Sequence, residues 1–337
     1  MSIVSVTNSD SAHLVATDSA QTSPTETLIS IVIPHLNQPA SLDVCLSILD
    51  EQTFPRSQFE VIVVDNGSTF SPEAIIARYP GTRLLREPQP GPGPARNLGA
   101  RHATGKYLAF IDADCRAHPN WLSAIARSLS SAPDGTILGG DVQIWRSNNE
   151  TYTPLEAYEC VFAYRFKLYI EKHGYCGTGN MAMRRSDFAR VGPFAGIQIA
   201  EDVEWGARAR AAELTLRYVP EMVVFHPARG SLQELCAKWQ RHIHHLLNAA
   251  RKKPGWRAQW IARAVAVLCS PVVDAAKVLS SDRLSGLSAR LKALYVLVIV
   301  RAYRAWKMID LLDRSGEVVW NRDAKLTAPS RDLLVNK

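Results

Sequence analysis

The segment from Tyr107 to Asp114, YLAFIDAD, ends a run of apolar residues with two aspartates, Asp112 and Asp114. Side chains alternate along a strand, so residues two apart point the same way. Two carboxylates on one side can share a divalent cation, and Mg²⁺ and Mn²⁺ prefer oxygen ligands while keeping positions for substrate phosphates. An Asp-x-Asp at a strand end also serves as a turn or a helix cap. The pattern therefore offers a metal-diphosphate site and leaves the structural alternative open.

Apolar strands and amphipathic helices alternate along the chain from Leu28 onward. We expect strands at residues 28–34, 59–65, 82–87, 107–112, 137–145 and 177–185, and a further strand or two before Phe225. We expect helices at about 42–50, 72–78, 94–103, 121–130, 156–171 and 201–212. Continuous apolar strands separated by helices predict a mainly parallel sheet covered on both faces, and such sheets bind ligands outside the carboxyl ends of their strands. Asn37, Asp65 and the Asp112/Asp114 pair follow three of these ends, so one crevice can collect them.

The charge of the chain is unevenly distributed. Its 337 residues carry a formal net charge of +7, and 47% are hydrophobic, which is enough for a sizeable core. Residues 28–230 have 20 basic and 21 acidic side chains, whereas residues 231–337 have 19 basic and 8 acidic ones. Residues 1–27 are rich in Ser, Thr, Asp and Ala without periodicity. We expect a disordered tail at 1–27, an α/β domain at 28–230 and a basic helical region at 231–337.

Cysteine usage and the terminal sequence indicate a reducing compartment. The six cysteines are scattered and form no C-x-x-C pair, which disfavours a zinc site or a disulfide framework. The N-terminus lacks a basic region followed by an apolar region, so no secretory signal is evident. The apolar run Ala293 to Val300 is far short of the ~20 residues that cross a bilayer. We expect a cytoplasmic protein without a transmembrane helix.

Four segments, in this order, resemble family-2 glycosyltransferases, which have the GT-A fold and transfer a sugar from an activated nucleotide donor. They are SIVIPHLN with EVIVVDNGS (30–37 and 60–68), GPGPARNLGARHATGKYLAFIDADC (91–115), GTGNMAMRRSDFARVGPF (177–194) and AEDVEWGARARAAELTLRYVPEMVVFHPARGS (200–231). The specificity comes from their order and spacing, because each fragment alone is weak. The resemblance covers about residues 28–245. It implies a GT-A-type, mainly parallel sheet flanked by helices, with residues 28–230 as the catalytic domain and a helical C-terminal extension.

The resemblance implies that the carboxyl edge of the sheet binds the nucleotide-sugar donor. Asp65 matches the family residue that contacts the base or its ribose, although a cap of the DNGS turn is an equally local explanation. Pro34 and Asn37 belong to the adjoining donor segment, in which Leu36 replaces the family's common aromatic residue. Arg96, at the start of a helix, is expected to meet diphosphate oxygens, with a solvated surface arginine as the alternative.

Asp112 and Asp114 match the family's D-x-D element, which holds a cation, Mg²⁺ or Mn²⁺, between the donor's phosphates. Asp112 thereby also counts among the donor-binding residues. A divalent ion stabilises the charge that develops on a nucleoside diphosphate leaving group. His226 occupies a region where some relatives supply a further metal or phosphate contact. A structural role for a lone histidine beside Pro227 is the alternative, which the sequence slightly favours.

Asp202 in the AED segment matches the family's catalytic base. A carboxylate that takes the proton of the acceptor hydroxyl is the usual solution for inverting transfer. The resemblance makes Glu201 an orienting residue for the acceptor or the base, and Trp205 a sugar-stacking residue. The alternatives are that the acids complement the helix dipole and that Trp205 is core. The segment CAKWQRHIHH (236–245) lacks the order of the processive Q-x-x-R-W signature, so we expect a non-processive enzyme. We interpret its histidines as a solvated or lipid-facing helix.

Partners and alternatives follow from the same residues. We expect a saccharide or lipid-linked acceptor in polysaccharide or glycoconjugate assembly, and no nucleic acid. A nucleotidyltransferase would normally have a Gly-rich, basic first loop, whereas the first strand here ends in PHLNQP (34–39). A non-catalytic nucleotide-sugar-binding scaffold stays open.

The segment LKALYVLVIVRAYRAWKM (291–308) combines aliphatic, aromatic and basic residues. It predicts either attachment to an anionic surface at the inner face of the plasma membrane or an ordinary packed subdomain.

Overall fold

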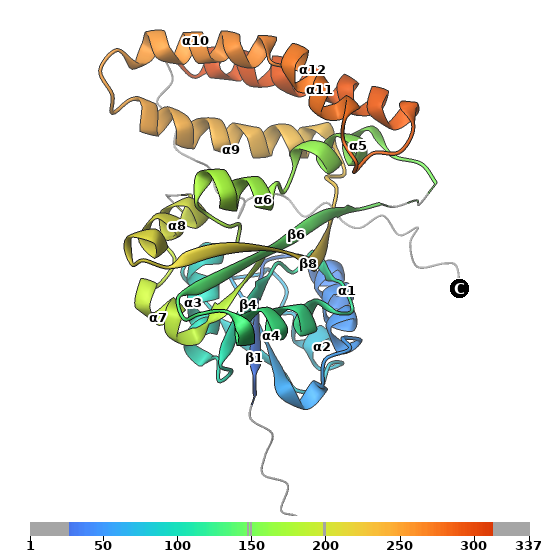
Figure 1. Ribbon diagram of the computed structural model, residues 1–337, viewed down its shortest axis with the longest axis vertical. Coiled ribbons are helices and arrows are strands. Elements are labelled where there is room, and N and C mark those ends of the chain that lie inside the picture. The colour runs from blue at the N-terminus through green and yellow to red at the C-terminus, as the bar shows by residue number, and fades with distance from the viewer. Residues whose placement is uncertain (1–26, 147, 149, 198–199, 313–337) are drawn as a thin grey trace, which may run out of the picture.

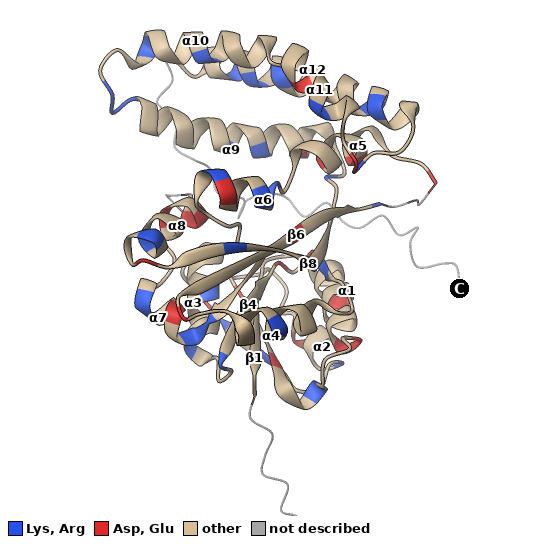
Figure 2. Cartoon of the chain, viewed as in Figure 1, with Lys and Arg blue, Asp and Glu red and all other residues tan. Residues whose placement is uncertain are grey.

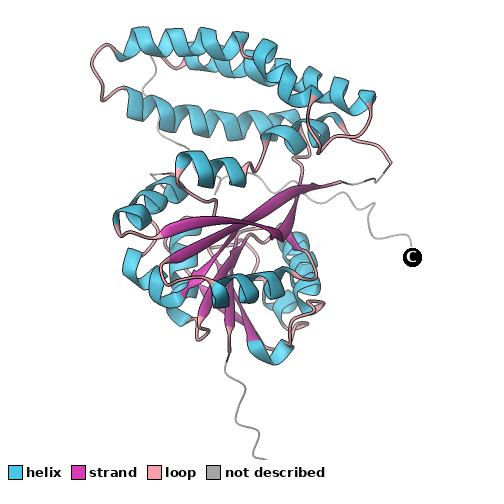
Figure 3. Ribbon diagram, viewed as in Figure 1, coloured by secondary structure: helices cyan, strands magenta, loops and turns pink. Residues whose placement is uncertain are grey.

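A computed structural model describes residues 27–146, 148, 150–197 and 200–312 (Figure 1). The predicted disordered tail at 1–27 therefore falls almost entirely outside the described residues. The described chain forms an α/β layer structure below a stack of long helices that come from its C-terminal third (Figure 3). No helix among the described residues combines the length and the apolar character that crossing a bilayer requires.

One mixed sheet of eight strands, in the order β3-β2-β1-β4-β7-β6-β8-β5, forms the centre of the described α/β part. Its strands are β1 (Ile29–His35), β2 (Phe59–Asp65), β3 (Thr82–Arg86), β4 (Tyr107–Ile111), β5 (Arg116–Ala117), β6 (Thr136–Trp145), β7 (Asn180–Arg184) and β8 (Thr215–Pro227). The first four strands of this order are parallel, as predicted, and β6 is parallel to β8. The β4–β7, β6–β7 and β5–β8 pairs are antiparallel. The carboxyl ends of β1, β2 and β4 therefore meet at one edge.

Helices cover both faces of this sheet because its strands are buried on both sides. One face of β1 packs with α1 (Pro39–Asp50) and α4 (Trp121–Ser131), whose buried anchors include Leu46 and Trp121. The other face packs with α3 (Pro92–His102), α7 (Arg185–Val191) and α8 (Glu201–Ala211). The short elements are η1 (Arg56–Gln58) and α2 (Glu73–Ile76). This arrangement confirms the predicted two-sided α/β architecture.

The chain between β6 and β7 corrects one prediction. We expected a single helix over residues 156–171. The structure has α5 (Pro154–Phe162), which is opened by a Thr153/Glu156 capping box, then α6 (Phe166–Leu168) and a π-helical turn, η2 (Tyr169–His173). Tyr164, between α5 and α6, has a φ of 47°, which lies in the left-handed region. This backbone breaks the helix and directs the Tyr164 side chain toward the sheet edge, where it contacts His226.

The C-terminal third forms the four helices α9 (Leu232–Ala250), α10 (Trp256–Cys269), α11 (Pro271–Leu279) and α12 (Leu287–Asp310). The breaks fall at Pro254, Pro271 and the 280–288 region, as the sequence predicts. Helix α12 buries Val296 and Leu297 against α5 and α9, and α10 covers the other part of α12 through Trp260. The helical region is therefore attached to the α/β part through α5.

Candidate active site

The carboxyl edge of the sheet borders a cavity of about 380 Å³. It is lined by the ends of β4 and β8, by residues between Phe162 and Gly179 before β7, by the first turn of α8 and by one side of α9. The polar and aromatic side chains of this lining include Asp112, Cys115, Tyr164, Tyr169, Tyr175, Asp202, His226, Lys238, Trp239 and His242. The structure thus brings Asp112 of the predicted D-x-D element and the predicted base Asp202 to one cavity, although the two residues are 90 positions apart in the sequence.

Asp112 is held by the buried guanidinium of Arg96. Arg96 Nη2 donates to Asp112 Oδ1 at 2.6 Å, and Nη1 donates to Glu201 Oε1 at 2.5 Å. Burial alone would lower the pKa of Arg96, but the Asp112 and Glu201 carboxylates outweigh it and raise that pKa. A Cβ on Gly179 would lie 2.7 Å from Asp112 Oδ2, so glycine is required beside this carboxylate. The Asp112 carboxylate is therefore held in one orientation by its ion pair with Arg96, which stays positively charged.

Asp114 faces His226 across the cavity edge. Asp114 Oδ2 lies 3.4 Å from His226 Nε2, and the Tyr164 hydroxyl is 2.8 Å from the same nitrogen. His226 Nδ1 lies 2.7 Å from the Pro227 carbonyl oxygen, which can only accept, so Nδ1 carries a proton and Nε2 is the nitrogen that faces Asp114 and Tyr164. Burial raises the pKa of Asp114, and the neighbouring His226 opposes that shift.

These side chains fit a divalent cation. One ligand atom each from Asp114, Cys115 and His226 lies within 4.8 Å of the others. A carboxylate oxygen and an imidazole nitrogen whose other nitrogen donates to a backbone carbonyl are a donor set that Mn²⁺ and similar ions accept. The geometry therefore favours the metal interpretation of His226 over the structural alternative that the sequence slightly favoured.

Asp202 lies in the first turn of α8 and lines the cavity. Its Oδ1 accepts from the Val203 backbone N–H at 2.9 Å. Burial raises the pKa of the Asp202 carboxyl above its ordinary range. A carboxylate with a raised pKa holds a captured proton better than an exposed one, which suits a general base.

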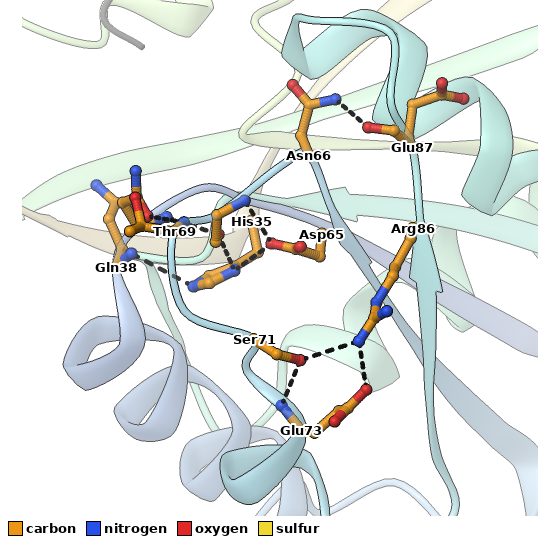
Figure 4. A network of polar contacts seen from close by, with 11 residues as sticks. His35, Gln38, Asp65, Asn66, Thr69, Ser71, Glu73, Arg86 and Glu87 are labelled. Carbon is orange, nitrogen blue, oxygen red and sulfur yellow. Dashed lines mark hydrogen bonds and ion pairs between the residues drawn. The ribbon is translucent and has the colours of Figure 1, made fainter. Parts of the chain in front are cut away.

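The ends of β1 and β2 form a separate polar network at the same sheet edge (Figure 4). Asp65 Oδ1 lies 3.3 Å from His35 Nδ1 and accepts from the Ser68 N–H at 3.3 Å. Asn37, with a φ of 53°, accepts from the Thr69 N–H through Oδ1 at 2.8 Å. The predicted turn-capping role of Asp65 is thus present, and Asn37 holds the loop after β2. A donor contact by either residue stays a prediction, as it does for the half-buried Pro34.

Three predicted roles need correction. Trp205 is 2% exposed and packs between Phe188 and Phe194, so it cannot stack on a sugar. Arg96 is 3% exposed and does not line the cavity, and its terminal nitrogens bind the Asp112 and Glu201 carboxylates instead of facing a diphosphate. Glu201 is the second partner of Arg96 and does not line the cavity, so its role is to hold Arg96 rather than the acceptor.

Sequence reasoning missed the contribution of α9 and of the 164–175 segment. Lys238, Trp239 and His242 lie at helical spacing on one side of α9 and line the cavity, whereas His244 is buried, so the interpretation of the histidines as a solvated or lipid-facing group does not hold for His244. Burial and the neighbouring Lys238 and Arg241 lower the pKa of His242 to about 4, which keeps it neutral at pH 7. The sequence signal for this lining was a cation, an aromatic ring and an imidazole at positions i, i+1 and i+4, which lie on one side of a helix.

Comparison with known proteins places this geometry in a family. The model of Glycosyl transferase family 2 matches residues 30–192. The glycosyltransferase AglE of Haloferax volcanii is 32% identical over 207 residues, which cover 60% of this chain and 67% of AglE. The validoxylamine A glucosyltransferase of Streptomyces hygroscopicus subsp. jinggangensis is 37% identical over 118 residues, but this stretch spans only 28% of that relative's length.

Among solved structures, the fold is similar to that of the mannosyltransferase PcManGT of Pyrobaculum calidifontis, which was solved with GDP-Man and Mn²⁺. The TM-score is 0.54 at 21% sequence identity, and the match covers 86% of this chain and 88% of that one. This likeness confirms the predicted GT-A fold. Together with the family model and the extended match to AglE, it leads to the conclusion that this chain belongs to glycosyltransferase family 2 and is a glycosyltransferase enzyme.

Proposed function

We propose that this enzyme transfers a sugar from a nucleoside-diphosphate sugar to an acceptor hydroxyl with inversion at the anomeric carbon. The observation that carries the proposal is that Asp112 and Asp202 line one cavity, beside the Asp114–His226 pair. Inverting transfer needs a base on one side of the reacting carbon and a stabilised leaving group on the other. The family membership favours this chemistry over nucleotidyl transfer and over a non-catalytic scaffold.

Asp202 is the base in this proposal. Its carboxylate takes the proton of the acceptor hydroxyl as the oxygen attacks the anomeric carbon, and the nucleoside diphosphate leaves on the opposite face. Asp114 and His226, with Asp112 beside them, are the residues that would hold Mg²⁺ or Mn²⁺. The bound cation supplies Lewis-acid stabilisation of the leaving diphosphate. Arg96 holds Asp112 in its orientation, and Glu201 keeps Arg96 in place.

The donor would enter along the sheet edge from β1 and β2. Asp65 and Asn37 stand where the strands end, as the resemblance implies for the base and ribose. The presence of GDP-Man and Mn²⁺ in the complex of the structurally similar PcManGT supports a nucleotide sugar and a divalent ion here. The base and the sugar of the donor are left open.

The acceptor would occupy the α9 side of the cavity. Aromatic rings of Tyr164, Tyr169, Tyr175 and Trp239 line this side, and sugar faces pack on such rings. A second, largely apolar groove of about 560 Å³ runs from Pro227, next to His226, to Tyr295 on α12. A groove of this kind suits the hydrocarbon of a lipid-linked acceptor better than a free saccharide.

The outer side of the C-terminal helices supports attachment to a membrane. Exposed large apolar residues recur along α12 at intervals of three or four positions in two groups, and they are 46% to 69% exposed: Leu287, Leu291, Tyr295 and Val298, and then Trp306 and Ile309. Exposed Val265, Leu268, Val272 and Val273 extend this surface over α10 and α11. Lys and Arg predominate over acidic residues on α10 to α12 (Figure 2). An apolar face beside basic residues suits the headgroup layer of an anionic membrane.

A panel of nucleotide sugars tests the donor half of the proposal. We expect one base and one sugar to raise the thermal unfolding midpoint of the full chain only when Mn²⁺ or Mg²⁺ is present. Product analysis by NMR with that donor then reports the anomeric configuration. Stabilisation without a metal requirement, or a product with retained configuration, would contradict the proposal.

A further inference from the structure

Lys238 is a cation of the active-site cavity that the mechanism above does not use. It lies in the second turn of α9 and lines the same cavity as Asp112 and Asp202. Its Nζ is 5.4 Å from the centroid of the Tyr164 ring. The hydroxyl of that ring contacts His226 Nε2, which faces Asp114. Tyr164 therefore contacts both Lys238 and the candidate cation site.

The protein supplies Lys238 with no anionic partner among the described residues. No hydrogen bond or ion pair within that part of the chain involves its ammonium group. The nearby carboxylate of Glu159 is fully buried and already taken by Arg229, which binds it through both its side chain and its backbone N–H. Arg96, the other buried cation at this edge, is likewise neutralised by two carboxylates. Glu159 and Asp112 are thus already paired with arginines, and Lys238 makes no ion pair with any described carboxylate.

The surroundings of Lys238 add positive charge rather than remove it. Burial, Arg229 and Arg241 lower the pKa of Lys238 to about 8, and Glu159 opposes this only in part. Arg241, one turn further along α9, also has no hydrogen bond or ion pair among the described residues. Two unpaired cations beside a cavity are unfavourable unless a ligand brings negative charge. The cavity wall on this side therefore has the electrostatics of an anion site.

We propose that Lys238, assisted by the field of Arg241, forms a phosphoryl-binding subsite on the α9 side of the cavity. The inference rests on the proposed glycosyl transfer and names a further substrate group at that site. Two substrates can supply the phosphoryl group. It is either the distal phosphate of the donor's diphosphate, which would be neutralised by Lys238 in addition to the cation, or a phosphate that is part of the acceptor.

Calorimetry on the full chain with two variants tests the subsite. Lys238→Met keeps the apolar stem and removes the charge, and Lys238→Arg keeps the charge. Lys252→Met is the matched control, because Lys252 is exposed in the α9–α10 connection and lies outside the residues that line the cavity. The probes are UDP and GDP against UMP and GMP, each with Mn²⁺, and octyl phosphate against octanol.

If the donor supplies the phosphate, Lys238→Met weakens the binding of the better nucleoside diphosphate about ten- to a hundredfold, as for a lost charge-assisted hydrogen bond, and spares the monophosphate. If the acceptor supplies it, nucleotide binding is unchanged and octyl phosphate binding falls by the same factor. Lys238→Arg restores most of the affinity in either case. Lys252→Met changes neither by more than about twofold, because exposed charges act weakly.

Unliganded stability separates this role from a structural one. Lys238→Met removes an unpaired charge from a cluster of cations, so its unfolding midpoint should equal or exceed that of the wild type. A lower midpoint with unchanged binding of every phosphate probe would overturn the subsite. Failure of the wild type to bind any nucleotide with Mn²⁺ would instead count against the proposed function, and octyl phosphate would still decide the role of Lys238.

Discussion

Three carboxylates of the active-site cavity differ because their neighbours differ. Asp112 is paired with a buried arginine, whereas Asp114 faces the Nε2 atom of His226. Asp202 has no cationic side chain in direct contact among the described residues, and burial raises its pKa. These differences support the proposed roles, which are cation binding for Asp112 and Asp114 and proton acceptance for Asp202.

Replacing Asp112 with asparagine should abolish metal-dependent nucleotide binding. The neutral amide is a poor ligand for a hard cation, and it leaves the buried Arg96 with one carboxylate instead of two. Calorimetry with UDP or GDP, with and without Mn²⁺, measures the change. Asp134→Asn is the matched control, because this exposed carboxylate precedes β6 at the opposite edge of the sheet. Unchanged affinity and metal dependence in Asp112→Asn would refute the assignment.

Replacing Asp202 with asparagine should lower the turnover rate by ~10²–10⁴ and leave donor affinity nearly unchanged, because a general base acts only in the transition state. Glu204→Gln, in the same helix turn and paired with Arg208, should stay close to the wild type. Near-normal turnover of Asp202→Asn would exclude this base.

The pH profile of the wild type gives an independent measurement of the base. Asp202 works only when it is deprotonated, and its pKa is raised by burial. Turnover should therefore fall as the pH decreases, and should do so at a higher pH than the ordinary aspartate value of about 3.9 would give. An acidic limb at or below that value would show that an unburied carboxylate, or no carboxylate, controls the step.

At the scale of elements, α12 connects the helical region to the α/β part. Its two sides differ sharply, since Leu297 is 0% exposed against α5 whereas Leu291 is 57% exposed. The segment Tyr164 to His173, between α5 and the sheet, carries several of the cavity's aromatic rings. Packing of α12 on α5 therefore also supports the segment that lines the proposed acceptor side of the cavity.

Truncation of Leu297 to alanine should cost about 2–5 kcal/mol of unfolding free energy, because it leaves a cavity in a packed core. Truncation of Leu291 should change the same quantity by no more than about 0.5 kcal/mol, as for an exposed surface residue. Denaturant unfolding of both variants compares them directly. Equal effects would mean that the two sides of α12 are buried to the same extent in solution.

At the scale of the whole molecule, the apolar stripe on α12 and the cavity lie on different sides of α9 and are linked by the groove from Pro227 to Tyr295. An enzyme attached through this stripe would hold its active site one helix layer away from the lipid headgroups. This arrangement is consistent with an acceptor that is anchored in the membrane.

Liposome co-sedimentation tests the attachment. Binding of the full chain should require anionic lipid and weaken as salt rises, because each basic residue near the surface contributes only ~1 kcal/mol and is screened. Leu291→Glu with Val298→Glu places charge on the exposed stripe and should abolish binding while keeping the unfolding midpoint. Salt-independent binding, or none, would favour the packed-subdomain alternative.

The local sequence pattern was sufficient to predict most of the secondary structure and part of the candidate site. Strand positions, the D-x-D element at the end of β4 and the breaks among the C-terminal helices were predictable, because apolar periodicity, prolines and strand ends act over a few residues. The grouping of Asp112, Asp114 and Asp202 followed from the rule for carboxyl edges together with the family resemblance. The helix over 156–171 was wrong because a left-handed backbone at Tyr164 overrides a favourable pattern.

Only the tertiary structure decided what each polar or aromatic side chain contacts. Arg96 meets Glu201 across 105 positions, and Tyr164 meets His226 across 62, so no local signal could show either pair. Trp205 has the same sequence environment whether it faces a sugar or the core. Burial and pairing depend on which surfaces the folded chain brings together, and this is why the sequence located the site while the fold assigned Arg96, Trp205, His226 and Lys238 their places in it.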